Sequence, residues 1–116
     1  MLILEVRFVG SVTVVDMAGS LVSPEEVQQF SKGIIHLVSS QKVRMLLLNL
    51  ERVSLISNQG VDALIEGFNH VNRNSGRLGL INLADRVERK LDERSLIPTV
   101  FRLFFSEDEA VADLGT

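Results

Sequence analysis

The sequence predicts a single α/β domain whose mixed, mostly parallel sheet begins with an antiparallel hairpin. Three features predict it: two short alternating segments open the chain, a continuous apolar run follows at residues 43–50, and helical and extended patterns alternate thereafter. Such alternation places parallel strands beside one another through right-handed crossovers. We expect the order ββαβαβαβα over residues 1–116, with about four helices.

The composition is typical of one compact domain. The chain has 116 residues, 46% of them hydrophobic, no cysteine and a formal net charge of −3. The missing cysteines exclude disulfide frameworks and thiolate metal centres. No apolar run approaches the roughly 20 residues of a membrane span, the start lacks a secretory signal, and the basic residues do not cluster as nucleic-acid binding requires. We expect a cytoplasmic protein that neither inserts into membranes nor binds nucleic acid; the oligomeric state stays open.

Alternation predicts the opening hairpin. Apolar and polar side chains alternate over residues 2–8, which indicates a half-buried strand. Gly10 and Ser11 then form a turn, and a second strand over residues 12–17 is ended by Gly19 and Ser20. The apolar face of the first strand would consist of Leu2, Leu4, Val6 and Phe8.

A helix and a buried strand follow the hairpin. Ser23 and Glu26 form a capping box around Pro24, which suits the first helical position because it has no N–H to satisfy. The one-sided apolar spacing then continues to about residue 40. Residues 43–50 are almost all apolar, as in a strand covered on both faces, so this strand is expected in the middle of the sheet.

The second half of the chain alternates helix and strand. A helix begins at the polar run 57–60 and ends at residues 74–76, with Gly76 expected in the left-handed conformation that often follows a helix. Residues 77–82 predict a strand, residues 84–94 a helix and residues 99–105 the last strand. Ser106 and Glu109 repeat the capping box and open a short helix that runs through Leu114.

The residues carry no recognisable catalytic or metal-binding pattern. Residues 53–60 form the richest segment at a strand's carboxyl end, where open α/β sheets bind ligands, but they include one glycine and no lysine, unlike a phosphate loop. His36 and His70 have no second ligand at metal-binding spacing. Asp62 and Glu66 share a helix face without the apolar enclosure that would raise a carboxyl pKa. We expect no enzyme activity, no metal and no cofactor.

The polar run Ser57, Asn58 and Gln59 has two explanations. Serine and asparagine are preferred helix caps, because their side-chain oxygens accept hydrogen bonds from the free N–H groups of the first turn. The same free donors and the positive end of the helix dipole also suit a recognition surface. Position and capping do not decide between the two.

Residues 53–65, VSLISNQGVDALI, resemble the signature of STAS domains. This family comprises sulfate transporter domains and anti-sigma factor antagonists, and in its signature an apolar pair leads into Asp-Ser-(Ser/Thr)-Gly and an Ala-Leu helix. Residues 14–21, 45–50 and 106–114 resemble the family's glycine-ended strand, central strand and closing helix. The resemblance implies the STAS fold and a protein partner, of the kind that is both an anti-sigma factor and a serine kinase.

The resemblance also indicates how this chain departs from the family. In the antagonists, the serine of Asp-Ser is phosphorylated, and the added charge breaks the partner complex. Here Ser57 stands at the aspartate position and Asn58 at the phosphoacceptor position, and an amide cannot accept a phosphoryl group. The implied module is permanently unphosphorylated and able to bind, with Ser57 as the candidate for a displaced phosphorylation site.

The resulting expectation is a docking surface at the start of the second helix. Asn58 and Gln59 would lie at its centre, with Ser57 shaping the cap. Asp62 and Glu66 would extend it along the helix, and Gly19, Ser20 and Leu21 would contribute from a neighbouring loop. Two alternatives stay open: an accessory or scaffold subunit of a transporter or signalling assembly, and a small α/β nucleotide-binding protein. The partner and its pathway are not specified by the sequence.

Overall fold

A computed structural model describes residues 1–115 and confirms the expected order of elements. The sheet has the order β1-β2-β3-β4-β5, in which β1 and β2 are antiparallel and the other neighbours are parallel. The strands are β1 (Leu2–Val9), β2 (Val12–Leu21), β3 (Met45–Ile56), β4 (Arg77–Ile81) and β5 (Arg102–Phe104). The helices are α1 (Pro24–Ile35), α2 (Asn58–Arg73), α3 (Asp85–Glu93) and α4 (Glu107–Leu114).

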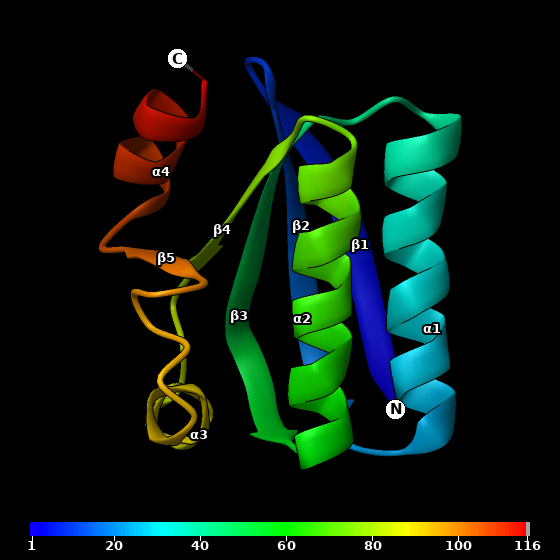
Figure 1. Cartoon of the computed structure of the whole chain (residues 1–116), viewed down its shortest axis with the longest axis vertical. Coiled ribbons are helices and arrows are strands. Elements are labelled where there is room, and N and C mark those ends of the chain that lie inside the picture. Colours follow the sequence, from blue (N-terminus) through cyan, green and yellow to red (C-terminus); the bar gives the residue numbers. More distant parts are fainter. Residues whose placement is uncertain (116) are drawn as a thin grey trace.

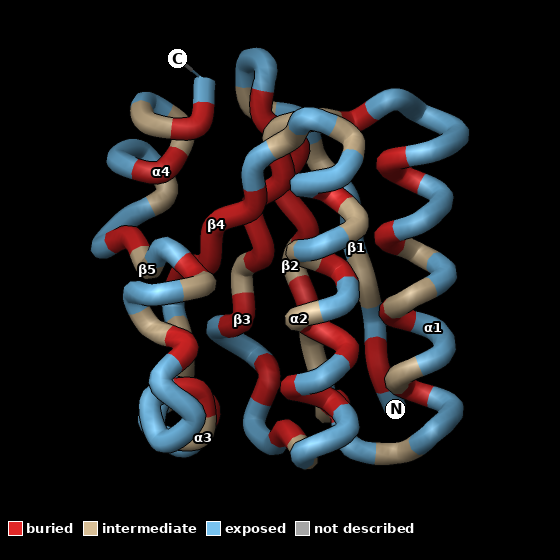
Figure 2. Tube along the Cα trace, viewed as in Figure 1, coloured by how far each residue is buried: buried red, intermediate tan, exposed pale blue. Residues whose placement is uncertain are grey.

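The helices cover the two faces of the sheet unequally. Helices α1 and α2 lie side by side over one face and run in the same direction (Figure 1). Helix α4, the last helix of the chain, packs on the other face. The core is divided accordingly: Leu46 and Leu48 of β3 belong to the large cluster beneath α1 and α2, and Leu47 belongs to the smaller cluster beneath α4. All three leucines have 0% of their surface exposed, and β3 is the third of the five strands, which confirms that this strand is central. Figure 2 shows long buried stretches along the strands of the sheet and alternating buried and exposed stretches along the helices.

Strands β2 and β3 are both longer than predicted. Strand β3 continues past residue 50 to Ile56, and β2 continues through Gly19 to Leu21 because the two strands remain paired there. The pairing shifts register between Gly19 and Ser20, and Gly19 has a φ of +108°. The extra residue of this bulge is Ser54 of β3, and Gly19 continues β2 instead of ending it. The hydrogen bonds between β2 and β3 keep both strands extended here, although Gly19 and Ser20 indicated the end of the strand.

Two further boundaries differ from the prediction. Helix α1 ends at Ile35, and the remaining turn to Ser40 is a π-helix (His36–Ser40). The last strand, predicted over residues 99–105, is confined to Arg102–Phe104 because the preceding backbone is folded into a turn, where the Phe101 N–H donates to the Leu96 carbonyl at 2.8 Å. The hydrophobic periodicity of residues 99–105 did not predict this turn.

The left-handed residue after α2 is Ser75 and not Gly76. Ser75 has a φ of +62°. Gly76 is required for a different reason, since a Cβ added there would lie 2.3 Å from the carbonyl oxygen of Arg44. The glycine thus permits a close approach of two backbone segments, and it does not supply the unusual φ.

The apolar face of β1 is covered along only part of its length. Leu2 is buried, whereas Val6 is 43% exposed and Phe8 is 67% exposed. Helix α1 accounts for the difference: its Gln29 donates to the Leu2 carbonyl at 2.7 Å, and its Gly33 lies against Leu4. Beyond that point the edge strand has no helix over it, so the predicted half-burial is wrong for Val6 and Phe8.

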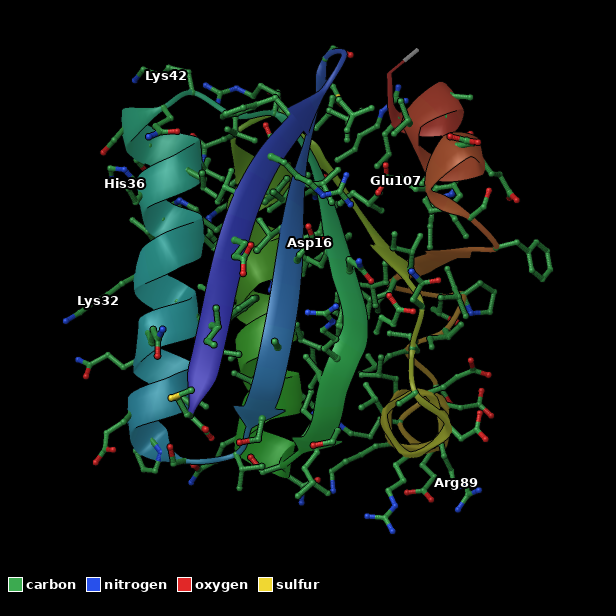
Figure 3. The ribbon with its side chains drawn as sticks, turned by 180° about the vertical axis from the view of Figure 1, so that it is seen from behind. Asp16, Lys32, His36, Lys42, Arg89 and Glu107 are labelled. Atoms are coloured by element: carbon green, nitrogen blue, oxygen red, sulfur yellow. The ribbon has the colours of Figure 1, made fainter. Side chains whose placement is uncertain are left out.

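A charged cluster fastens α4 to the other face of the sheet. Arg7 of β1 donates from Nε to Asp16 Oδ2 at 2.5 Å and from Nη1 to Glu107 Oε2 at 3.1 Å. Asn49 donates to Asp16 Oδ1 at 2.8 Å. The Arg7 guanidinium, through its hydrogen bonds, holds the pKa of Asp16 below its usual range. Figure 3 shows Asp16 on β2 and Glu107 at the start of α4.

A buried carboxylate fixes the connection from β2 to α1. Glu26 Oε1 accepts from the backbone N–H groups of Val22 and Ser23, both at 3.0 Å, and Oε2 accepts from the Ser20 hydroxyl at 2.7 Å. The α-ammonium group of Met1 forms an ion pair with the same carboxylate. The Met1 ammonium, followed by these hydrogen bonds, lowers the pKa of Glu26 well below its ordinary value. The expected capping box is confirmed as part of this cluster.

Gly60 lets the first turn of α2 approach the end of β2. A Cβ at Gly60 would lie 2.2 Å from the Leu21 carbonyl oxygen and 2.8 Å from Ile56 Cγ1. Both neighbours belong to the paired ends of β2 and β3. The position of α2 on the sheet therefore depends on the absence of a side chain at this residue.

Replacing Glu26 by glutamine should destabilise the protein at neutral pH and make it less sensitive to acid. Because the pKa of Glu26 is lower in the folded than in the unfolded chain, its stabilising contribution is complete above the unfolded value of about 4.3 and is lost as the pH falls toward the folded value. Urea unfolding of both proteins from pH 7 to pH 3 measures this. The difference in unfolding free energy between the two proteins should shrink as the pH falls below about 4.3; a constant difference would contradict the assignment.

Replacing Gly60 by alanine should lower the unfolding free energy by about 1–3 kcal/mol, since the new methyl group overlaps backbone atoms that cannot move independently. The matched control is Gly67→Ala on the same helix, where the added Cβ would meet Phe30 at an ordinary 3.5 Å. That change should be neutral or stabilising by up to about 1 kcal/mol. Urea denaturation compares them, and equal effects of the two substitutions would refute the close-approach role of Gly60.

Candidate partner-binding site

Ser57 joins the start of α2 to the end of β2. Its backbone N–H donates to the Leu21 carbonyl at 3.1 Å, and its hydroxyl donates to the Val22 carbonyl at 3.1 Å. The same hydroxyl oxygen accepts from the Gly60 N–H at 3.1 Å, which makes Ser57 the N-cap of α2. Its side chain is therefore engaged on both sides and only half-exposed.

Asn58 and Gln59 form the exposed first turn of α2. The first intrahelical bond runs from the Val61 N–H to the Ser57 carbonyl, so the N–H groups of Asn58 and Gln59 precede the helical hydrogen-bond ladder. Two backbone donors, two side-chain amides and the positive end of the helix dipole thus face outward together. This arrangement suits a hydrogen-bonded contact with another molecule.

Two exposed apolar side chains flank this turn. Val22 follows β2 and is 39% exposed, and Leu55 near the end of β3 is 46% exposed. Leu55 stands opposite Ser20 in the strand pairing, and Val22 accepts the Ser57 hydroxyl through its carbonyl. Sequence reasoning missed both residues, because it ended the buried strand at residue 50 and gave Val22 no role. Regular alternation would place Leu55 on the same face as the buried Val53. The extra residue Ser54 shifts the pairing, so that Leu55 is exposed between Val53 and Ile56, both buried, and no local signal indicated this.

The three residues expected from the neighbouring loop lie on β2 instead. Leu21 has 0% of its surface exposed, so it contributes to this region through its carbonyl, which accepts from Ser57, and not through its side chain. Ser20 directs its hydroxyl at Glu26. Gly19 is exposed, and a Cβ there would lie 2.1 Å from the Met1 carbonyl oxygen. These residues lie beneath the first turn of α2, and of the three only Gly19 is exposed.

Asp62 and Glu66 continue along the exposed side of α2. Asp62 forms an ion pair with Arg94, at 3.0 Å between Oδ1 and Nη2, which connects α2 to the end of α3. Arg94 was not predicted to reach the site, and nothing in its local sequence indicated the contact. Together with Gln59, both carboxylates line a groove of about 540 Å³ that α2 shares with the start of α1.

The described residues were compared with the patterns of a metal site and of a membrane-spanning helix. Across residues 1–115, no three histidine, aspartate or glutamate side chains are grouped so that they could hold a metal ion. Each helix in this part of the chain is too short or too polar to cross a bilayer.

Comparison with known proteins identifies the family. No curated protein matches the sequence. A protein from Thermotoga maritima described as an anti-sigma factor antagonist has a TM-score of 0.87 at 17% identity, over 97% of this chain and 95% of that one. The Bacillus cell fate determinant SpoIIAA in its phosphorylated form has a TM-score of 0.74 at 19% identity, over 96% of this chain and 98% of the other.

A sulfate transporter family protein from Wolinella succinogenes has the same fold, with a TM-score of 0.75 at 21% identity over 90% of this chain and 85% of that one. At these identities the structures show a shared fold. The family itself is shown by the sequence model of the STAS domain, which matches residues 4–110. The chain therefore belongs to the STAS domain family.

Proposed function

We propose that this protein is an interaction module of a bacterial partner-switching pathway, of the anti-sigma factor antagonist type, and that it is not an enzyme. The observation that carries the proposal is the exposed turn of Asn58 and Gln59, held rigidly by Ser57 and bordered by Val22 and Leu55. Its fold likeness to the Thermotoga maritima protein described as an anti-sigma factor antagonist, and to SpoIIAA, whose unphosphorylated form is described in the same way, supports the same role. The partner is a protein of the type of an anti-sigma factor serine kinase.

The composition of this surface favours a protein partner. Val22 and Leu55 supply apolar contact area, and the amides of Asn58 and Gln59 supply directional hydrogen bonds. A patch with apolar contacts and a few well-placed polar groups is typical of protein interfaces. Because Ser57 and Gly60 hold the turn in place, little conformational entropy is lost when a partner binds.

The chemistry at positions 57 and 58 argues against a phosphorylation switch. Asn58 has an amide that cannot accept a phosphoryl group. Ser57 does have a hydroxyl, but that group already donates to Val22 and accepts from Gly60. A phosphoryl group on Ser57 would remove the O–H that donates to the Val22 carbonyl and would bring negatively charged oxygens against that carbonyl. The proposed module is therefore always in its binding form.

Replacing Asn58 by aspartate should weaken the partner complex by about tenfold, equivalent to about 1.4 kcal/mol. The new carboxylate has nearly the same size as the amide but would have to be desolvated at the centre of the contact. Titration calorimetry with the purified anti-sigma factor kinase of the same organism measures this. Asn72→Asp, an equally exposed change at the other end of α2, is the matched control and should leave the affinity unchanged. Equal affinities for all three proteins would remove Asn58 from the interface.

Replacing Asn58 by serine should create a phosphorylation site. After incubation with the same kinase and ATP, intact-mass analysis should show one added phosphoryl group on the Asn58→Ser variant and none on the wild-type protein. A double variant that also carries Ser57→Ala tests which hydroxyl is modified and should still be phosphorylated. Phosphorylation of the wild-type protein at Ser57 would contradict the constitutive binding form.

A further inference from the structure

A groove continues from the docking surface along the whole length of α1 and α2. Its first part, of about 540 Å³, lies near the starts of the two helices, and its second part, of about 210 Å³, lies near their ends. Glu66 lines both parts, so the hollows adjoin. Figure 1 shows the two helices side by side and beginning at the same end. We call this feature the α1–α2 groove.

The floor of the α1–α2 groove is apolar. Val27 and Ala63 line the first part, and Ile34, Ile35 and Gly67 line the second. Ile35 is 50% exposed despite its apolar side chain. Gly67 has no side chain and packs against Phe30, which keeps the floor low at the middle of α2. A floor of this shape accepts the apolar stripe of one further helix.

The walls of the groove change charge along its length. Glu66 and Asp62 line it toward the starts of the helices, and Arg73 and His70 line it toward their ends. Asp62 is partly neutralised by Arg94, but among residues 1–115 no ion pair is recorded for Glu66 or Arg73. The groove is thus acidic at one end and basic at the other.

The dipoles of α1 and α2 favour the same orientation of a bound helix as the charged side chains do. Because α1 and α2 run in the same direction, the positive ends of both dipoles lie at the acidic end of the groove. A third helix packs favourably if its C-terminus lies at that end. Lysine and arginine near its C-terminus would then meet Asp62 and Glu66, and acidic residues near its N-terminus would meet Arg73.

We infer that the α1–α2 groove binds one amphipathic helix of the protein partner, antiparallel to α1 and α2, with acidic residues in its N-terminal half and basic residues in its C-terminal half. The inference rests on the proposed function, since Gln59 and Asp62 border both the docking surface and the groove. Helix α1 has 12 residues, which corresponds to a length of about 18 Å. A partner helix of three to four turns would fill the groove.

Two synthetic helical peptides of identical composition test the orientation. Both have the same apolar stripe, one with acidic residues before basic ones and the other with the charges in reverse order. Fluorescence anisotropy should show at least about tenfold tighter binding of the acidic-first peptide. Equal binding of the two peptides, or no saturable binding of either, would overturn the inference.

Charge reversal in the groove should switch this preference. The single variants Glu66→Lys and Arg73→Glu should each weaken binding of the acidic-first peptide by about threefold to tenfold, and the double variant should prefer the reversed peptide. Arg89→Glu on α3 is the matched control, because Arg89 is equally exposed and does not line the groove. A double variant that keeps the original preference would overturn the inference.

The intact partner separates this inference from the proposed function. Ile35→Glu alters the far end of the groove, and Asn58→Asp alters the docking surface; both residues are exposed, so both variants should fold. Weakened binding by both variants is expected. If only Asn58→Asp weakens the complex, the groove inference fails and the proposed function stands. If only Ile35→Glu does, the groove binds the partner and the surface around Asn58 does not.

Discussion

The contact between the end of β2 and the first turn of α2 determines where the rest of the candidate site lies. The Leu21 carbonyl accepts from the Ser57 N–H, and it leaves no space for a side chain at Gly60. The Ser57 hydroxyl then closes the turn by bonding to Val22 and Gly60. Asn58 and Gln59 face outward because their neighbours on both sides are fixed to the sheet.

Charged groups are distributed differently on the two sides of the molecule. On the α4 side, Arg7 is engaged with Asp16 and Glu107, so its charge serves to hold the fold together. On the α1 and α2 side, Glu66 and Arg73 line an open groove instead. A charged side chain that is already paired within the fold contributes little to the binding of a partner. A charged side chain beside an apolar floor can select a partner and its orientation. The apolar floor beside Glu66 and Arg73 supports a partner on the side of α1 and α2.

The order of elements follows from local sequence patterns, because each element has its own periodicity and caps. The leucines of β3 and the caps Ser23, Ser57 and Ser106 were all predictable in this way. The extension of β3 was not, since it depends on pairing with β2, and residues 51–54 are polar or flanked by polar residues. For the same reason, the exposure of Leu55 and the Asp62–Arg94 contact required the three-dimensional structure.

Partner binding through the start of α2 is tested most directly by the footprint of the partner on the isotopically labelled protein, measured by nuclear magnetic resonance. The largest amide shifts are expected at Val22, Leu55, Asn58 and Gln59, continuing along α2 toward Arg73. A footprint confined to β1 and α4, with the start of α2 unchanged, would contradict the proposed site and would favour a scaffold role that uses the opposite face.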